Sequence, residues 1–281
     1  MTRGAVKPPE PVLTAHLFPE LLTRLLEVLG PLPVHEWDAP VPRKSWTVHE
    51  VALHLLGGDV GILSRGRDSF MRSRIDAATG VELVAALAAR NNLWIAAGRR
   101  MSPQLLCDLL RLTGSQTTTY FQSLDPDAPG EVVSWAGPAP APNWLDIGRE
   151  YTERWHHQQH IRAALHRQGL TDPRYLKPAL DIFMRALRMA YRRVDAPDGA
   201  SVTVTITGDS GSRWTLRRED RIWSLYIGTA VRPAASVTIP EHSAWKLFTR
   251  WMPAEEARAS SRIDGDPRLA APVFDTTAVI A

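Results

Sequence analysis

Residues 194–207 read VDAPDGASVTVTIT, and the hydrophobic pattern of the chain changes at this stretch. The first eight of these residues are rich in turn formers, which predicts a linker over 194–201. The last six alternate Val or Ile with Thr, a pattern typical of a β-strand. Before the linker, by contrast, apolar residues recur at intervals of three and four, as they do in amphipathic helices. We therefore predict two domains of different class, joined by residues 194–201.

The first domain is predicted to be an all-α, up-down helical bundle over residues 14–193, preceded by a tail over 1–13. A capping box formed by Thr47 and Glu50 marks the start of one helix. A stretch with five prolines and two glycines, 125–142, is predicted to be a long connection. Helical periodicity is found in six segments, at about 17–29, 47–62, 81–98, 103–124, 143–167 and 174–193.

The second domain, over residues 202–281, is predicted to be a small α+β domain. A helix that carries Trp245 and Trp251 follows its main strands, and a terminal helix follows Pro267. The expected strands lie at 202–207, 213–217, 222–227, 235–239 and about 261–263.

Composition excludes several classes of protein. Of 281 residues, 44% are hydrophobic and 22% are charged, which is typical of a globular chain and not of a disordered one. The net charge of +3 is dispersed, so we expect no nucleic-acid partner. With neither a long apolar run nor a signal-peptide core, we expect no membrane partner and a cytoplasmic location. The oligomeric state stays open.

The cysteine content restricts the possible metal sites. Cys107 is the only cysteine, so the monomer can form no internal disulfide and no zinc site built from several cysteines. Its neighbours are leucines, and we expect it to lie in the core. Any metal must therefore be held by histidine and carboxylate side chains.

One predicted helix carries an acidic and histidine-rich face. Positions 146, 150, 153, 157 and 160 fall on the same side and read Asp, Glu, Glu, His, His. Two interpretations are open: a solvent-facing stripe of Glu–His pairs, or half of a metal site. A metal would need a third ligand from another helix. His54 is the best candidate, although a lone histidine on so apolar a helix can also be a core residue. Three protein ligands would leave a position open for catalysis.

At these residues the sequence resembles a known family. Residues 46–55 read WTVHEVALHL and residues 153–163 read ERWHHQQHIRA. Both look like the metal motifs of DinB-like helical bundles, and more specifically of the mycothiol-dependent maleylpyruvate isomerase family. Features that look like the sterol-carrier-like C-terminal domain of that family are Gly208-Asp209, Trp214, Trp223, the run 244–247 and Gly265-Asp266-Pro267.

The resemblance implies a set of site residues. The metal ligands of the family fall on His54, Glu153 and His157, and zinc suits two histidines, a glutamate and an open position. His160 stands where the family has an aspartate, which would support a ligand imidazole, so Glu150 could take over that part. Glu150 and His160 are expected to support the ligands or to serve as alternative ligands, with Glu150 the alternative to Glu153. Arg162 and Asn91 are candidates for binding thiol or substrate.

The resemblance also implies an activity. Family members isomerise a cis double bond by transient addition of a low-molecular-weight thiol, whose thiolate is the nucleophile. We expect a mycothiol-like thiol, a divalent metal and a small electrophile such as maleylpyruvate, with isomerisation or thiol transfer as the reaction. No residue is assigned a catalytic role. Two alternatives stay open: a paralogue that keeps the metal without turnover, or a module that binds a hydrophobic ligand through Trp214, Trp223, Trp245 and Trp251.

Overall fold

The computed structural model describes residues 6–72, 75 and 80–279, which form two compact units. The helical unit comprises Leu13–Ala128 and Ile147–Leu170, and the sheet unit comprises residues 6–12, Pro129–Asp146 and residues 171–279. A helical N-terminal region and a C-terminal region built on a sheet are thus confirmed. The division places the segment after Leu170 with the sheet, and the linker at 194–201 stays a prediction.

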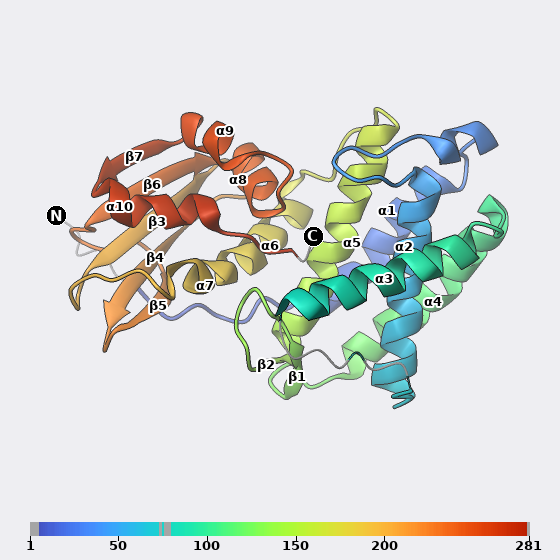
Figure 1. Ribbon diagram of the computed structural model, residues 1–281, viewed down its shortest axis with the longest axis horizontal. Coiled ribbons are helices and arrows are strands. Elements are labelled where there is room, and N and C mark those ends of the chain that lie inside the picture. The colour runs from blue at the N-terminus through green and yellow to red at the C-terminus, as the bar shows by residue number, and fades with distance from the viewer. Residues whose placement is uncertain (1–5, 73–74, 76–79, 280–281) are drawn as a thin grey trace. The chain divides into compact units, whose positions relative to one another are not determined.

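The helices expected in the N-terminal region are present (Figure 1). Short turns of other helix types are found at Ala15–Leu17 and Val34–Asp38 (3-10) and at Leu63–Arg67 (π). The α-helices are α1 (Phe18–Leu29), α2 (Val48–Ile62), α3 (Gly80–Gly98), α4 (Pro103–Ser123) and α5 (Asn143–Ala164).

Helix α2 lies at the centre of the helical unit, because it contacts both α3 and α4. Val51, Ala52 and Leu53 are consecutive and all fully buried, so successive faces of the helix pack against neighbours. The predicted capping box is confirmed: the Glu50 N–H donates to Thr47 Oγ1 at 3.3 Å and the Thr47 N–H to Glu50 Oε2 at 3.0 Å. The start of α2 is therefore fixed, and with it the direction of its side chains.

The sheet unit contains a five-stranded sheet in the order β5-β4-β3-β6-β7. The central strand β3 pairs in parallel with β6, and all other pairs are antiparallel. The strands are β3 (Ser201–Thr207), β4 (Ser212–Glu219), β5 (Ile222–Ile227), β6 (Ala235–Pro240) and β7 (Arg262–Gly265), and the helices after β6 are α8 (Glu241–Phe248), α9 (Ala254–Ala259) and α10 (Pro267–Ala270), followed by a 3-10 turn at Ala271–Asp275.

The structure corrects two details of the predicted elements. The single helix expected over 174–193 is divided into α6 (Pro173–Phe183) and α7 (Leu187–Tyr191) by a 3-10 turn at Met184–Ala186. The connection 125–142 holds two short paired strands, β1 (Pro129–Val132) and β2 (Pro140–Pro142). Periodicity misses both features, since a tightened turn keeps almost the same apolar spacing and these strands are very short.

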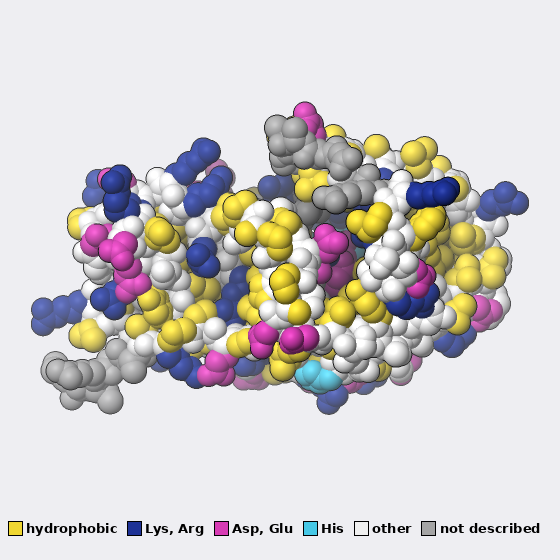
Figure 2. Space-filling view, turned by 90° about the horizontal axis from the view of Figure 1, so that it is seen from below, with side chains coloured by type: hydrophobic (Ala, Val, Ile, Leu, Met, Phe, Trp, Pro, Cys, Tyr) yellow, Lys and Arg dark blue, Asp and Glu magenta, His cyan; other side chains and the backbone are white. Residues whose placement is uncertain are grey.

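The protein surface carries charged and hydrophobic side chains without separation by type on the face that we show (Figure 2). On the face drawn in Figure 2, Lys and Arg side chains lie among acidic and hydrophobic ones. Among the described residues, no helix is long and apolar enough to cross a membrane.

Tyr191 at the end of α7 is fully buried, and its hydroxyl donates to the Leu269 carbonyl oxygen at 2.5 Å. Burial raises the pKa of Tyr191 far above its usual value. A raised pKa stabilises the folded state below the unfolded pKa of about 10, and this stability is lost as pH rises beyond it. We expect Tyr191→Phe to lower the free energy of unfolding by about 1–3 kcal/mol at pH 7, because it leaves the carbonyl without its donor. At pH 11 the difference in unfolding free energy between wild type and variant should be smaller by about 1.4 kcal/mol, because only the wild type has a tyrosine here that ionises on unfolding. Urea unfolding at both pH values checks this, and a gap independent of pH would contradict it.

Candidate metal centre

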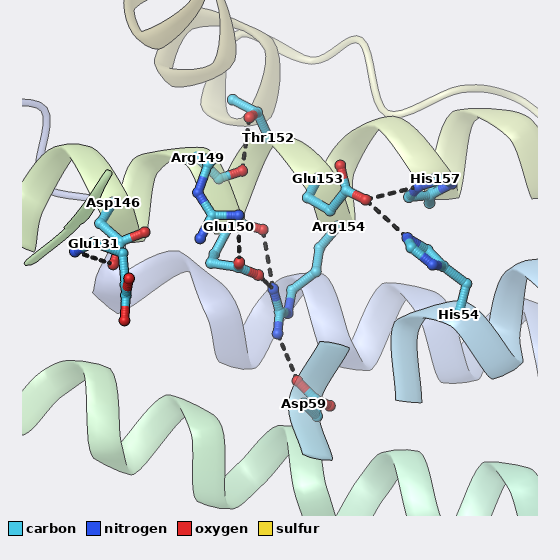
Figure 3. Close-up of polar contacts among 10 residues, drawn as sticks. All are labelled: His54, Asp59, Glu131, Asp146, Arg149, Glu150, Thr152, Glu153, Arg154 and His157. Carbon is cyan, nitrogen blue, oxygen red and sulfur yellow. Dashed lines mark hydrogen bonds and ion pairs between the residues drawn. The ribbon is translucent and has the colours of Figure 1, made fainter. Parts of the chain in front are cut away.

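Three side chains from two helices meet around one carboxylate oxygen. His54 Nε2 on α2 lies 2.9 Å from Glu153 Oε1 on α5, and His157 Nε2, one turn further along α5, lies 3.0 Å from the same oxygen. One ligand atom from each residue lies within 4.8 Å of the other two. Figure 3 shows both imidazoles directed toward Glu153. The structure thus brings together residues that are 99 positions apart in the sequence.

Burial and neighbouring groups shift the pKa values of Glu153 and His157. Burial opposes ionisation of Glu153, but its electrostatic interaction with His157 and the hydrogen bonds from both imidazoles outweigh it, so the pKa of Glu153 lies well below its usual value. Burial also lowers the pKa of His157, in spite of the nearby Glu153 carboxylate. A carboxylate and a neutral imidazole are the forms that bind metals.

The site has a closed side and an open side. The His157 side chain is only 3% exposed and that of His54 is 16% exposed, whereas the Glu153 side chain is 33% exposed. A cation held by the three residues would therefore have protein on the imidazole side and access near Glu153. Such access suits a catalytic metal site rather than a closed structural one.

Trp46 packs against the candidate ligands, although it was predicted only as part of the motif 46–55 and without a role of its own. Its ring centroid lies 5.0 Å from that of His54 and 6.2 Å from that of His157, stacked on the latter. The two histidine rings are themselves 4.6 Å apart. Trp46 directly precedes Thr47, the N-cap of α2, so the capping box places it. An aromatic residue just before a capping box is the signal that could have identified it.

Glu150 lies outside this group of ligand atoms. Its carboxylate is paired with Arg149 at 2.8 Å and with Arg154 at 2.6 Å, and Arg154 is paired in turn with Asp59 of α2 at 2.5 Å (Figure 3). Burial opposes ionisation of Glu150, but the two arginines lower its pKa. The same helical face thus serves two purposes: Glu153 faces the histidines, while Glu150 holds two arginines.

His160 lies beside the site. Its ring centroid is 5.4 Å from that of the ligand candidate His157 and 4.4 Å from that of His156. All three side chains are buried, and burial lowers the pKa of His160 and brings the pKa of His156 to about 3. His160 and His156 are therefore neutral groups that pack against His157. A supporting role for His160 and for Glu150 stays a prediction.

The two residues predicted to bind thiol or substrate have other surroundings. The Arg162 guanidinium donates to the carbonyl oxygens of Gln168 and Arg24, at 3.1 and 3.0 Å. Asn91 is half-buried on α3, and the contacts of the described residues do not link it to His54, Glu153 or His157. The structure thus adds no support for either role.

The four tryptophans considered for a hydrophobic pocket belong to the sheet unit. Trp214, Trp223 and Trp245 are buried, and Trp245 meets Trp251 edge to face at 5.3 Å. The indole N–H of Trp223 donates to the Val194 carbonyl oxygen at 2.9 Å. These contacts are typical of core residues.

Comparison with known proteins places the chain in a family. The family model described as "Mycothiol maleylpyruvate isomerase N-terminal domain" matches residues 18–162, which include all three members of the site. Two crystal structures of the mycothiol-dependent maleylpyruvate isomerase, one of them of a histidine-to-alanine mutant, are similar with a TM-score of 0.50. Each match covers 84% of this chain and 88% of the other chain. The sequence identity is 11% for the unmodified protein and 10% for the mutant, so the matches show a common fold. No curated protein sequence matches. Because the family model spans more than half of its length, this chain belongs to the mycothiol-dependent maleylpyruvate isomerase family.

Proposed function

We propose that this protein is a metal-dependent enzyme that uses a low-molecular-weight thiol, mycothiol or a similar compound, on a small electrophile such as maleylpyruvate. The reaction is isomerisation of a cis double bond or transfer of the thiol. The observation that carries the proposal is the convergence of His54, Glu153 and His157 on one point. Family membership and the fold shared with mycothiol-dependent maleylpyruvate isomerase support the thiol and the electrophile.

The donor set fits a divalent cation, and zinc best among the common ones. Two imidazole nitrogens and one carboxylate oxygen are a usual set of three protein ligands at catalytic zinc sites. When bound, the cation would hold a thiol as its thiolate and polarise a substrate oxygen. His54 and His157 would supply imidazole nitrogens, Glu153 would supply the negative charge, and Trp46 packs against both imidazole rings.

The thiol must come from outside the chain. Cys107 is the only cysteine, it is 4% exposed, and burial raises the pKa of its thiol. A buried thiol with a raised pKa is a poor nucleophile. The chain therefore holds the metal in our proposal, and a small thiol performs the addition.

The ligand assignment is tested by zinc affinity in His54→Ala and His157→Ala. We expect each variant to bind zinc more than about 100-fold more weakly, which exceeds the 10–100-fold loss typical of residues that only support a ligand. His49→Ala is the matched control, because His49 lies on α2 as His54 does but its Nε2 is 3.1 Å from the Met101 carbonyl oxygen. Unchanged zinc affinity in both site variants would refute the metal centre.

The reaction is tested with the zinc-loaded wild type, maleylpyruvate and mycothiol. We expect turnover that requires both zinc and thiol, and that disappears in His157→Ala but not in His49→Ala. Turnover without added thiol, or with full rate after chelation of zinc, would contradict the proposed chemistry. Zinc binding without any turnover on several thiols and electrophiles would instead favour a paralogue that has lost activity.

A further inference from the structure

We propose that Lys44 forms an anion-binding subsite beside the His54–Glu153–His157 group and takes a carboxylate of the electrophilic substrate. This inference rests on the proposed function, because it assigns a substrate class to the same site. It follows from the position of Lys44 on Trp46, from the lack of an acidic partner among the residues that the structure describes, and from the charge expected at the site.

The position of Lys44 is set by a short loop. The Val41 N–H donates to the Trp46 carbonyl oxygen at 2.9 Å, and Pro40 pairs with Thr47, so residues 42–45 form the turn. The Lys44 ammonium lies 5.2 Å from the centre of the Trp46 ring, a cation–π distance. Trp46 in turn contacts the rings of His54 and His157. One indole therefore connects the ammonium to the metal ligands.

The Lys44 ammonium and the rings of His54 and His157 all lie within 6.2 Å of the centre of the Trp46 ring. An anion that reached both Lys44 and a cation held by the histidines would be attracted by both.

Lys44 is half-buried, yet in the described part of the chain no acidic side chain forms an ion pair with it. Partial burial of an ammonium without a counter-charge costs free energy of hydration, and a charge-assisted contact with an anion would offset that cost.

The backbone beside Lys44 is unusual. Arg43 has a φ of 64°, in the left-handed region that non-glycine residues adopt rarely. Backbone of this kind is often retained where a side chain must be presented for function.

The charge balance also favours an anion. A divalent cation with one glutamate leaves a net charge of about +1, and Lys44, which contacts the same Trp46 ring as the two histidines, adds a second positive charge nearby. The arginine predicted for this role, Arg162, already donates to two backbone carbonyl oxygens. We infer that a small carboxylate-bearing electrophile is preferred over a neutral one.

The inference is tested by calorimetric binding of maleate to the zinc-loaded, full-length protein at low ionic strength. We expect Lys44→Met to weaken maleate binding by about tenfold or more, the loss of one charge-assisted contact. Lys44→Arg should bind as the wild type does. The matched control is Arg43→Asn, which removes a charge from the same loop with a residue that tolerates a positive φ, and it should have little effect. Direct contact of maleate with zinc is common to all these variants and cancels in the comparison.

Three outcomes would overturn the inference: no maleate binding to the wild type, equal maleate affinity in wild type and Lys44→Met, or an equal loss of dimethyl maleate binding in Lys44→Met. The last would show that Lys44 acts by packing and not by charge. Zinc content separates this inference from the metal centre, since Lys44→Met should keep its zinc while His157→Ala loses it. Maleate binding that depends on Lys44 in a protein that binds no zinc would support the anion subsite and refute the proposed enzyme.

Discussion

Replacement of Arg154 by methionine is expected to lower the free energy of unfolding by about 3–5 kcal/mol, the usual cost of removing one partner from a buried ion pair. The Arg154 side chain is 14% exposed, and its partners Asp59 and Glu150 are 5% and 11% exposed. Burial opposes its charge, but the two carboxylates raise the pKa of Arg154 above its usual value. Without the arginine, two carboxylates stay buried without a shared counter-charge. Urea unfolding of variant and wild type measures the loss.

The matched control for this prediction is Arg111→Met on α4. Arg111 pairs with Asp108 at 2.8 Å, but both side chains are more than half exposed, so the change should cost less than about 1 kcal/mol. The triple variant Asp59→Asn/Glu150→Gln/Arg154→Met also removes the charges of the two carboxylates that lose their arginine partner. It should therefore recover part of the lost stability. Equal stability of Arg154→Met and Arg111→Met would show that the buried network contributes no more than a surface pair.

Arg154→Met should also weaken zinc binding while leaving the ligand residues intact. Arg154 joins α5 to Asp59 of α2, the same two helices that carry Glu153 and His54. The ion pair therefore helps to hold the ligand-bearing helices in register, in addition to its effect on stability. Zinc affinity measured well below the unfolding transition tests this positioning role, and unchanged affinity would contradict it.

Removal of zinc by a chelator is expected to lower the free energy of unfolding by about 4 kcal/mol, if free zinc stood 1,000-fold above its Kd beforehand. A cation held by these residues would bind only the folded chain, because His54 is 99 residues from Glu153 in sequence and meets it only when α2 packs near α5. The free energy of unfolding should increase with the logarithm of the zinc concentration. Zinc should barely stabilise His157→Ala, whereas it should stabilise His49→Ala as much as the wild type.

The helical circular dichroism signal of the chelated protein should nevertheless remain close to that of the loaded one. The helical unit has an apolar core independent of the cation, with Val51, Leu53, Leu106 and Leu110 at most 1% exposed. We therefore expect metal-free protein that is folded but less stable. Collapse of the helical signal on chelation would show that the metal is structural and would count against a catalytic role.

The fold could be predicted largely because its signals are local. The repeat of apolar residues predicted the ends of α1–α4 to within one residue and the end of α5 to within three, and the Thr47–Glu50 pair marked the start of α2. Alternation of Val and Thr marked β3. The interruption of the helix after Phe183 could not be predicted, because residues 184–186 are compatible with either helix type and the choice depends on tertiary packing.

The candidate site could be predicted only in part, because helical spacing places residues on a face but does not choose their partners. The i, i+4 relation of Glu153 and His157 was visible in the sequence, and His54 was proposed from its unusual apolar surroundings. The partners of Glu150 were not visible, since they depend on how Arg149 and Arg154 extend and on Asp59 of another helix. Lys44 was missed for the same reason, and Trp46 was quoted in the motif 46–55 without a role, because packing against the imidazoles depends on the folded structure.

All three donor atoms come from α2 and α5, within the part of the chain that ends at Leu170. Sequence changes confined to residues 171–279 therefore leave all three candidate donors in place. Related chains could differ throughout that stretch and still keep the same candidate donor set.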